Sequence, residues 1–175
     1  MVRGTDPARQ SGRAGRVARA TSIPVAVGER LSGLMEFHAA LDAGARILQP
    51  ALGRAGGIWV GKKIATLAEA RGAQIAPHLY AGPVEWAANV HLAVTCPNIL
   101  MVEAIESPFH DALVSGRPRV EQGFVAAPGA PGLGITLNDD VARAHRYTGD
   151  KLHLQMQEGP IDWANGNAWA GGASD

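Results

Sequence analysis

The chain has 175 residues, enough for one domain with a substantial hydrophobic core. Its 16 basic and 16 acidic side chains balance, so the charge indicates neither a nucleic-acid-binding surface nor an acidic solvating tail. The single cysteine, Cys96, excludes an internal disulfide and favours a reducing compartment, with a small buried side chain as its expected role. No apolar run is long enough to span a membrane and no signal-peptide segment is evident, so we expect a cytoplasmic protein.

The N-terminal part is expected to lead into a first strand and helix. Residues 1–20 hold five arginines with little periodicity, which suggests a loose leader or the remnant of a helix. From Thr21 to Glu29, β-branched residues predict a strand, and Gly28 permits a turn beside Glu29. Ser32 is the expected N-cap of the next helix. The predicted buried stripe of this helix consists of Leu34, Phe37 or His38, and Leu41.

The stretch from Ile47 to His78 organises the rest of the chain. An apolar strand over Ile47–Leu52, a glycine-rich turn, a helix over Ile58–Arg71 and a strand over Gln74–His78 form one predicted βαβ unit. The unit ends on an imidazole at the C-terminal tip of a strand, where ligands and chemistry collect in α/β folds.

Another helix begins at Gly82 and Pro83, and Ile99–Ile105 forms a fourth strand that carries Glu103. Parallel strands that alternate with helices are spaced as in half of an eight-stranded barrel. We therefore divide the chain by composition and pattern. The expected parts are the leader (1–20), a half-barrel (21–106), an irregular C-terminal segment (107–153) with one short helical stretch over Asp139–Arg146, and a mobile tail (154–175).

Several motifs, in this order, resemble those of the enolase superfamily. They are GE after the first strand, QPxxGRAGGI after the second, APH at the third, PN-ILMVE at the fourth, and a closing PGLGI. The resemblance is to the mandelate racemase and muconate lactonizing enzyme branch, particularly its acid-sugar dehydratases, and runs from about Thr21 to His153. It implies an α/β fold, the C-terminal half of a (β/α) TIM-type barrel (strands five to eight), followed by an irregular segment.

The resemblance also implies roles for three residues. Glu29 matches the fifth-strand ligand of a magnesium ion that family members hold with three carboxylates. His78 matches the base at the end of the seventh strand, and Glu103 the catalytic acidic residue that ends the eighth. Residues 132–135 match the return of the chain to a capping domain.

These residue types suit removal of the proton beside a substrate carboxylate. The dianion that forms needs a hard cation that prefers oxygen ligands. A histidine can take the proton and later give it to a departing hydroxide. A carboxylic acid opposite the metal can hydrogen-bond the developing oxyanion if it retains its proton.

Two features depart from the family's pattern. Position 51 is alanine where the pattern QPD has the aspartate that orients the seventh-strand histidine. We therefore expect His78 to lack that partner, and Ala51→Asp to raise the rate of a reconstituted enzyme roughly ten- to a hundredfold. The capping domain, the first four strands and two of the three metal carboxylates have no counterpart here. Glu29 alone cannot hold magnesium in a specific site.

Ordinary structural interpretations stand beside the functional ones. Glu29 could pair with Arg30, His78 could be a structural histidine, and Glu103 an unremarkable strand-end carboxylate. Arg54 either contacts a substrate carboxylate or is an exposed residue at a helix start. The other histidines share no metal-ligand spacing and are interpreted as structural or surface residues: His38, His91, His110, His145 and His153.

The functional hypothesis is a truncated member of the family, ancestrally a magnesium-dependent hydro-lyase that removes water from a sugar acid. We expect the isolated chain to be inactive. The alternatives are a non-catalytic fragment or half-enzyme that needs a complementing chain, and a racemase or epimerase of a 2-hydroxy acid. Half a barrel leaves open sheet edges and an exposed apolar face, so the expected partners are a second copy or a complementing N-terminal half, with neither nucleic acid nor membrane.

Overall fold

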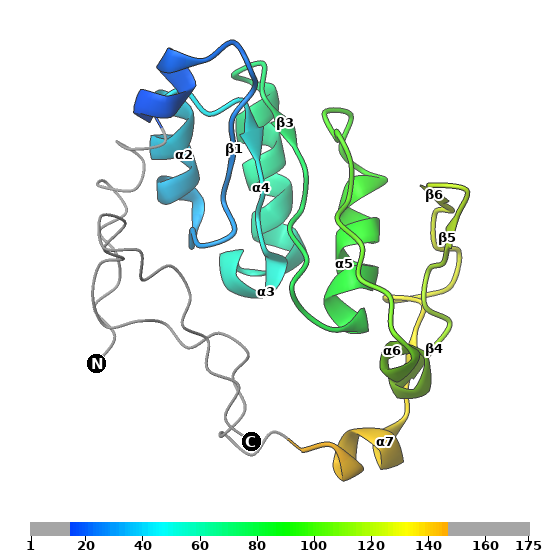
Figure 1. Cartoon of the computed structure of the whole chain (residues 1–175). Coiled ribbons are helices and arrows are strands. Elements are labelled where there is room, and N and C mark those ends of the chain that lie inside the picture. The colour runs from blue at the N-terminus through cyan, green and yellow to red at the C-terminus, as the bar shows by residue number, and fades with distance from the viewer. Residues whose placement is uncertain (1–14, 147–175) are drawn as a thin grey trace. The chain divides into compact units, whose positions relative to one another are not determined.

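The computed structural model describes residues 15–146 of the chain (Figure 1). Helices and short strands alternate in its first part, which confirms the predicted α/β fold. The elements are β1 (Ala26–Val27), α2 (Leu34–Asp42), β2 (Ile47–Leu48), α3 (Leu52–Ala55), α4 (Gly57–Glu69), β3 (Gln74–Ile75) and α5 (Pro83–Ala93).

The strands form one parallel sheet in the order β1, β2, β3. Ala26 pairs with Ile47, and Ile47 in turn pairs with Gln74. A single parallel bridge joins Ile75 to Ile99, and the Glu103 amide donates to the Pro77 carbonyl at 3.3 Å. The strand predicted over Ile99–Ile105 is thus reduced to one bridge, since residues 100–106 have no regular secondary structure. The segment still runs beside β3, and the order follows chain order as in a barrel.

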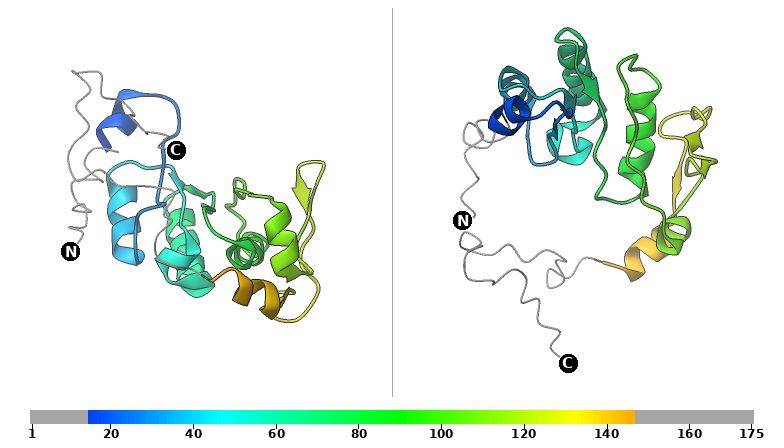
Figure 2. Two further views of the ribbon diagram at one scale, coloured as in Figure 1. Left: turned by 60° about the horizontal axis from the view of Figure 1, so that its bottom comes forward. Right: turned by 45° about the horizontal axis from the view of Figure 1, so that its top comes forward.

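The helices pack against the sheet and against one another. Helices α2, α4 and α5 are neighbours in chain order, as two further views show (Figure 2). Leu48 and Ile75 are fully buried in the core that also holds Phe37, Leu41 and Ile64. The second position of the predicted α2 stripe is therefore Phe37, while His38 remains partly exposed.

The prediction for Ser32 is wrong. The residue that caps α2 is Gly33, and its cap has no side-chain hydrogen bond. The Ser32 backbone N–H instead donates to the carboxylate of Glu36 in the first helical turn. Glu36 thus ties the residue before the cap to the first turn, and its negative charge near the helix N-terminus is favoured by the helix dipole.

Two glycines have positive φ angles that residues with a side chain rarely adopt. Gly28, just after β1, has φ near 148°, and a Cβ there would lie 2.8 Å from backbone atoms of Gln49. Gly56 has φ near 115° and separates α3 from α4, so the single predicted glycine turn contains a short helix. The strand predicted over Ile47–Leu52 is correspondingly shorter, because Leu52 already begins α3.

The segment after Ser107 has more regular structure than its composition predicted. Two antiparallel pairs of two-residue strands, β4 with β7 and β5 with β6, lie between two short helices. The elements are α6 (Pro108–Leu113), β4 (Val114–Ser115), β5 (Val120–Glu121), β6 (Phe124–Val125), β7 (Thr136–Leu137) and α7 (Asp139–Ala144). The last helix confirms the short helical stretch predicted there.

A polar cluster fixes this segment. The guanidinium of Arg117, only 2% exposed, donates to Asp111 at 2.9 and 3.0 Å and to Glu106 at 3.0 Å. Beside it, the Trp86 indole N–H donates to the Pro118 carbonyl at 2.8 Å. The segment is thereby tied to the buried side of α5.

The described residues begin within the expected leader, and residues 15–20 are helical. The predicted mobile tail (154–175) and His153, the last residue of the predicted irregular segment, lie outside them. Within residues 15–146, no helix combines the length and the apolar character needed to cross a bilayer.

Candidate active site at the strand ends

His78 and Glu103 follow neighbouring strands and meet at the same edge of the sheet. The His78 backbone N–H donates to the Pro50 carbonyl at 3.1 Å, which holds it beside the residues that follow β2. Glu103 is held beside Pro77 in the same way. Because parallel strands point their C-terminal ends in one direction, the two side chains reach one place.

The two side chains are in direct contact. His78 Nδ1 lies 2.8 Å from Glu103 Oε2, and the Leu79 backbone N–H donates to the same oxygen at 2.8 Å. The His78 side chain is 21% exposed and that of Glu103 is 45% exposed. This pair is reachable from solvent, as an acid–base group must be, yet one imidazole nitrogen is already engaged.

Asn89 is a contributor that the sequence analysis missed. It is fully buried on α5 and donates its amide to the His78 carbonyl at 3.1 Å. Leu79, Trp86 and Val90 pack together in a small core at this end of the sheet. The apolar spacing of this helix gave no signal, because it did not place Asn89 on the buried face; in the structure Asn89 is buried, where an amide normally has a specific partner.

Position 51 lies beside His78, as the family pattern implies. Ala51 forms a parallel bridge with His78, so a side chain at this position would neighbour the imidazole. The aspartate partner expected from the family is absent, and the effect of Ala51→Asp stays a prediction. A different carboxylate, that of Glu103, lies 2.8 Å from His78 Nδ1, because the eighth-strand segment runs close beside Pro77.

Glu29 has a different environment. Its side chain is 51% exposed and lies 3.6 Å from Arg30, the ion pair anticipated as its ordinary interpretation. Among residues 15–146, no three histidine, cysteine, aspartate or glutamate side chains gather where a metal ion could bind. These residues therefore do not fit a magnesium site by themselves, since a hard cation needs several oxygen ligands.

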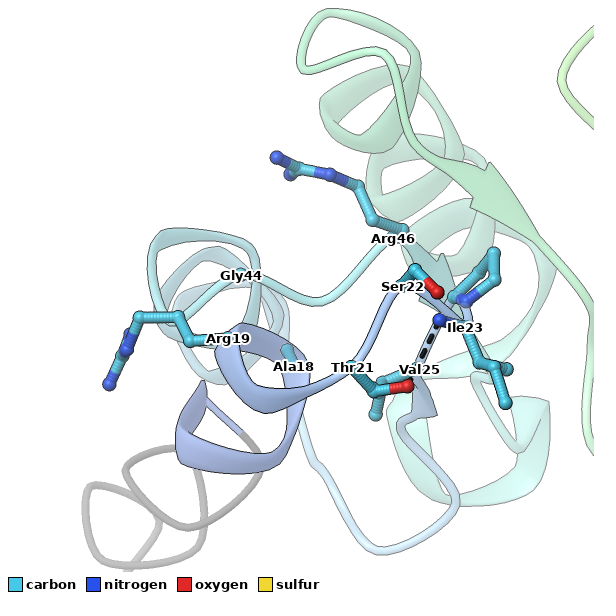
Figure 3. Close-up of a pocket in the computed structure, with 9 residues that line it drawn as sticks. Ala18, Arg19, Thr21, Ser22, Ile23, Val25, Gly44 and Arg46 are labelled. Carbon is cyan, nitrogen blue, oxygen red and sulfur yellow. Dashed lines mark hydrogen bonds between the residues drawn. The ribbon is translucent and has the colours of Figure 1, made fainter.

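A hollow of about 290 Å³ lies at the opposite end of the strands (Figure 3). It is lined by residues that precede β1 and β2, among them Thr21, Ser22, Val25 and Arg46. Figure 3 shows the side chains of Arg19 and Arg46 extending away from Thr21 and Ser22. Because chemistry in such folds collects at the C-terminal ends of strands, this hollow is not the candidate site.

The remaining candidates have structural surroundings. His38 lies 3.1 Å from Asp42, which also pairs with Arg71 at 2.8 Å, so it belongs to a surface network. Arg54 is exposed on α3. Cys96 is buried and free, as expected of a small core residue.

A run of parallel strands and covering helices, with a histidine and a glutamate paired at the strands' C-terminal ends, is typical of part of a (β/α) barrel. The family model that matches is described as enolase C-terminal domain-like and covers residues 6–141. The chain belongs to this family.

Relatives of known structure agree with the fold. A mandelate racemase/muconate lactonizing enzyme from a Jannaschia species is 74% identical with a TM-score of 0.82, over 85% of this chain and 39% of that one. A mandelate racemase/muconate lactonizing enzyme-like protein from a Roseovarius species is 59% identical with a TM-score of 0.83, over 90% of this chain and 40% of that one. The matched part is the C-terminal half of the barrel.

Curated relatives include D-galactonate dehydratases. The protein from Variovorax paradoxus is 34% identical over 160 residues, which cover 86% of this chain and 39% of the relative. One from Xanthomonas campestris is 33% identical over 159 residues. The chain thus spans about two fifths of the length of the curated relatives it matches.

Proposed function

We propose that this chain supplies the base of an acid-sugar dehydratase, in an active site completed by residues outside the described part. The observation that carries the proposal is the solvent-reachable His78–Glu103 pair at the C-terminal ends of adjacent strands. The D-galactonate dehydratases among the relatives support a sugar acid as the substrate class. Activity requires a complementing barrel half, because one side of the sheet ends at β1 among the described strands.

The contacts of His78 determine which of its nitrogens reacts. Nδ1 faces Glu103, so Nε2 is the nitrogen that takes the proton from the carbon beside the substrate carboxylate. The C–H bond breaks and its electron pair stays on the substrate. His78 then returns the proton to the departing hydroxyl on the next carbon, and water leaves as the carbon–oxygen bond breaks. The imidazole ends the cycle neutral.

The metal of the family has a smaller place in this proposal. The described residues do not fit a magnesium site, and no step above is assigned to the ion. Glu29 would supply one oxygen ligand, with the others coming from residues outside the described part. The role predicted for Glu103 as a hydrogen-bond donor to the oxyanion stays a prediction.

The test is reconstitution. The chain is combined with the N-terminal part of a D-galactonate dehydratase, as a separate chain or by fusion, and water loss is measured on a panel of sugar acids. We expect turnover that His78→Ala abolishes and His38→Ala, a change in the surface network, leaves intact. Turnover that persists in His78→Ala contradicts the assignment of the base. No turnover on any sugar acid in an assembled, folded complex favours the non-catalytic fragment.

A second activity is favoured by the structural relatives, whose descriptions include mandelate racemase. Racemisation of a 2-hydroxy acid needs the same proton abstraction but no loss of water. The reconstituted protein in deuterated water distinguishes the two: uptake of deuterium beside the carboxylate without dehydration identifies a racemase or epimerase.

The partner and location follow the same reasoning. We propose a second copy or a complementing N-terminal half at the open edge of β1, and a cytoplasmic location that suits the unpaired Cys96. Size-exclusion chromatography over a range of concentrations tests self-association, and a monomer at every concentration contradicts it.

A further inference from the structure

We propose that Glu103 is the positioning residue of His78 and replaces the sixth-strand acid that is alanine at position 51. It holds the imidazole in the tautomer that presents Nε2 to the substrate. This inference rests on the proposed function in taking His78 as the base, but its first test requires no turnover.

A short contact between the two side chains carries the argument. Oε2 of Glu103 lies 2.8 Å from His78 Nδ1 and accepts the Leu79 backbone N–H at the same distance. An ionised carboxylate oxygen has no proton to donate, so a proton on Nδ1 is the arrangement that avoids two lone pairs facing each other at this distance. In a neutral imidazole the other nitrogen, Nε2, then has the lone pair that abstracts a proton.

The carboxylate is itself held in place. Leu79 is fully buried, so its N–H is a fixed donor, and the backbone of Glu103 is bound to Pro77. Asn89, also fully buried, holds the His78 carbonyl. The ring therefore sits between a fixed main chain and a fixed acceptor, as histidines do when a neighbouring group sets their orientation.

A purely structural ion pair is the competing interpretation. Glu103 is nearly half exposed, and pairs of that kind contribute little to stability. A structural role therefore predicts a small effect of Glu103 on stability and none on the tautomer of His78. A positioning role predicts that Glu103 determines the tautomer of His78. Position 51 offers a direct test, because Ala51 forms a bridge with His78.

The first experiment measures the tautomer by nitrogen-15 NMR of the full chain at alkaline pH, without substrate or metal. We expect the Nδ1–H form for His78 in the wild type and the Nε2–H form in Glu103→Ala. Glu103→Ala/Ala51→Asp, which moves the carboxylate to the other side of the ring, should restore the Nδ1–H form. Glu103→Gln keeps the side chain's size and folding, and should move the Nδ1 proton upfield because an amide oxygen is a weaker acceptor.

Wild-type His78 in the Nε2–H form overturns the proposal, as does a spectrum that neither Glu103→Ala nor Glu103→Gln alters. The second experiment uses the reconstituted enzyme. Glu103→Ala should lower kcat about ten- to a hundredfold with a smaller change in KM, and adding Ala51→Asp should restore most of the loss. A rise in KM that Ala51→Asp does not correct means that Glu103 touches the substrate directly, which contradicts a positioning role.

The two experiments separate the hypotheses. If the tautomers behave as expected but no sugar acid turns over, the proposed function fails while the positioning role stands. If turnover depends on His78 but the tautomers do not respond, the proposed function stands and this inference fails.

Discussion

The C-terminal ends of β1 and β3 each carry a residue that matches the family's pattern, and their surroundings differ greatly. After β3, the backbone N–H and carbonyl of His78 are hydrogen-bonded to Pro50 and Asn89, and its ring nitrogen Nδ1 lies 2.8 Å from Glu103. After β1, Glu29 is half exposed and contacts the next residue in the chain. The acid–base end is assembled from residues of this chain, whereas the metal end has one candidate ligand among the described residues.

This difference shows what a part of a barrel can specify. The geometry of a base depends on one neighbouring strand and the helix behind it, and both are present. A magnesium site draws ligands from several strands around the ring. The proposed acid–base pair is therefore local, whereas a magnesium site of the family's kind would need carboxylates from several strands of a barrel.

The largest effect is expected from a substitution in the small core that packs beside His78 and Glu103. Trp86 is 2% exposed and packs with Leu79 and Val90, so Trp86→Ala should lower the free energy of unfolding by about 3–5 kcal/mol. Chemical denaturation measures the change. Trp86→Phe keeps a ring but loses the bond to Pro118, and should cost clearly less. Equal losses for both variants would mean that packing is not the main contribution.

A smaller loss is expected at Asn89. Asn89→Ala leaves the His78 carbonyl without its donor and should cost about 1–3 kcal/mol in unfolding free energy. Val84→Ala, an exposed position on the same helix, is the matched control and should change little. If both variants unfold at the same denaturant concentration as the wild type, the bond to His78 contributes nothing.

Low pH should destabilise the segment that contains Asp111 and Arg117. Hydrogen bonds from Arg117, and then from Arg119, hold the pKa of Asp111 below its ordinary value. A carboxyl with a depressed folded pKa stabilises the protein above its unfolded pKa, and the contribution is lost as the pH falls through the folded pKa. Asp111→Asn should therefore flatten the loss of stability below about pH 4. Identical acid titrations of the variant and the wild type, followed by circular dichroism, would contradict this.

The smallest effect is expected at Glu29. Because its ion pair is exposed, Glu29→Gln should change unfolding free energy by less than about 0.5 kcal/mol. In the reconstituted enzyme, the same variant should bind magnesium more weakly and so require a higher magnesium concentration for turnover. A large loss of stability would show that Glu29 is structural and would remove the contrast between the two strand ends.

The sequence predicted the parts of the fold that depend on local pattern. Hydrophobic spacing located α4 and α5, and the motifs placed Ala51 beside His78 in the ladder. The pattern could not show that Glu103 would reach His78 Nδ1, because that contact depends on how far the eighth-strand segment runs past Pro77. The cap of α2 was also missed, because serine is a common N-cap residue, whereas the backbone turn at Gly33 determines where this helix begins.

The close approach of Gly28 to Gln49 has a mechanical consequence. The turn that carries Glu29 rests against the backbone of Gln49, whose N–H is bound to Val27. The next residue, Pro50, holds the N–H of His78. Main-chain contacts alone therefore connect the turn that carries Glu29 with the backbone of His78, and any side chain at position 28 would collide with Gln49 in the middle of that connection.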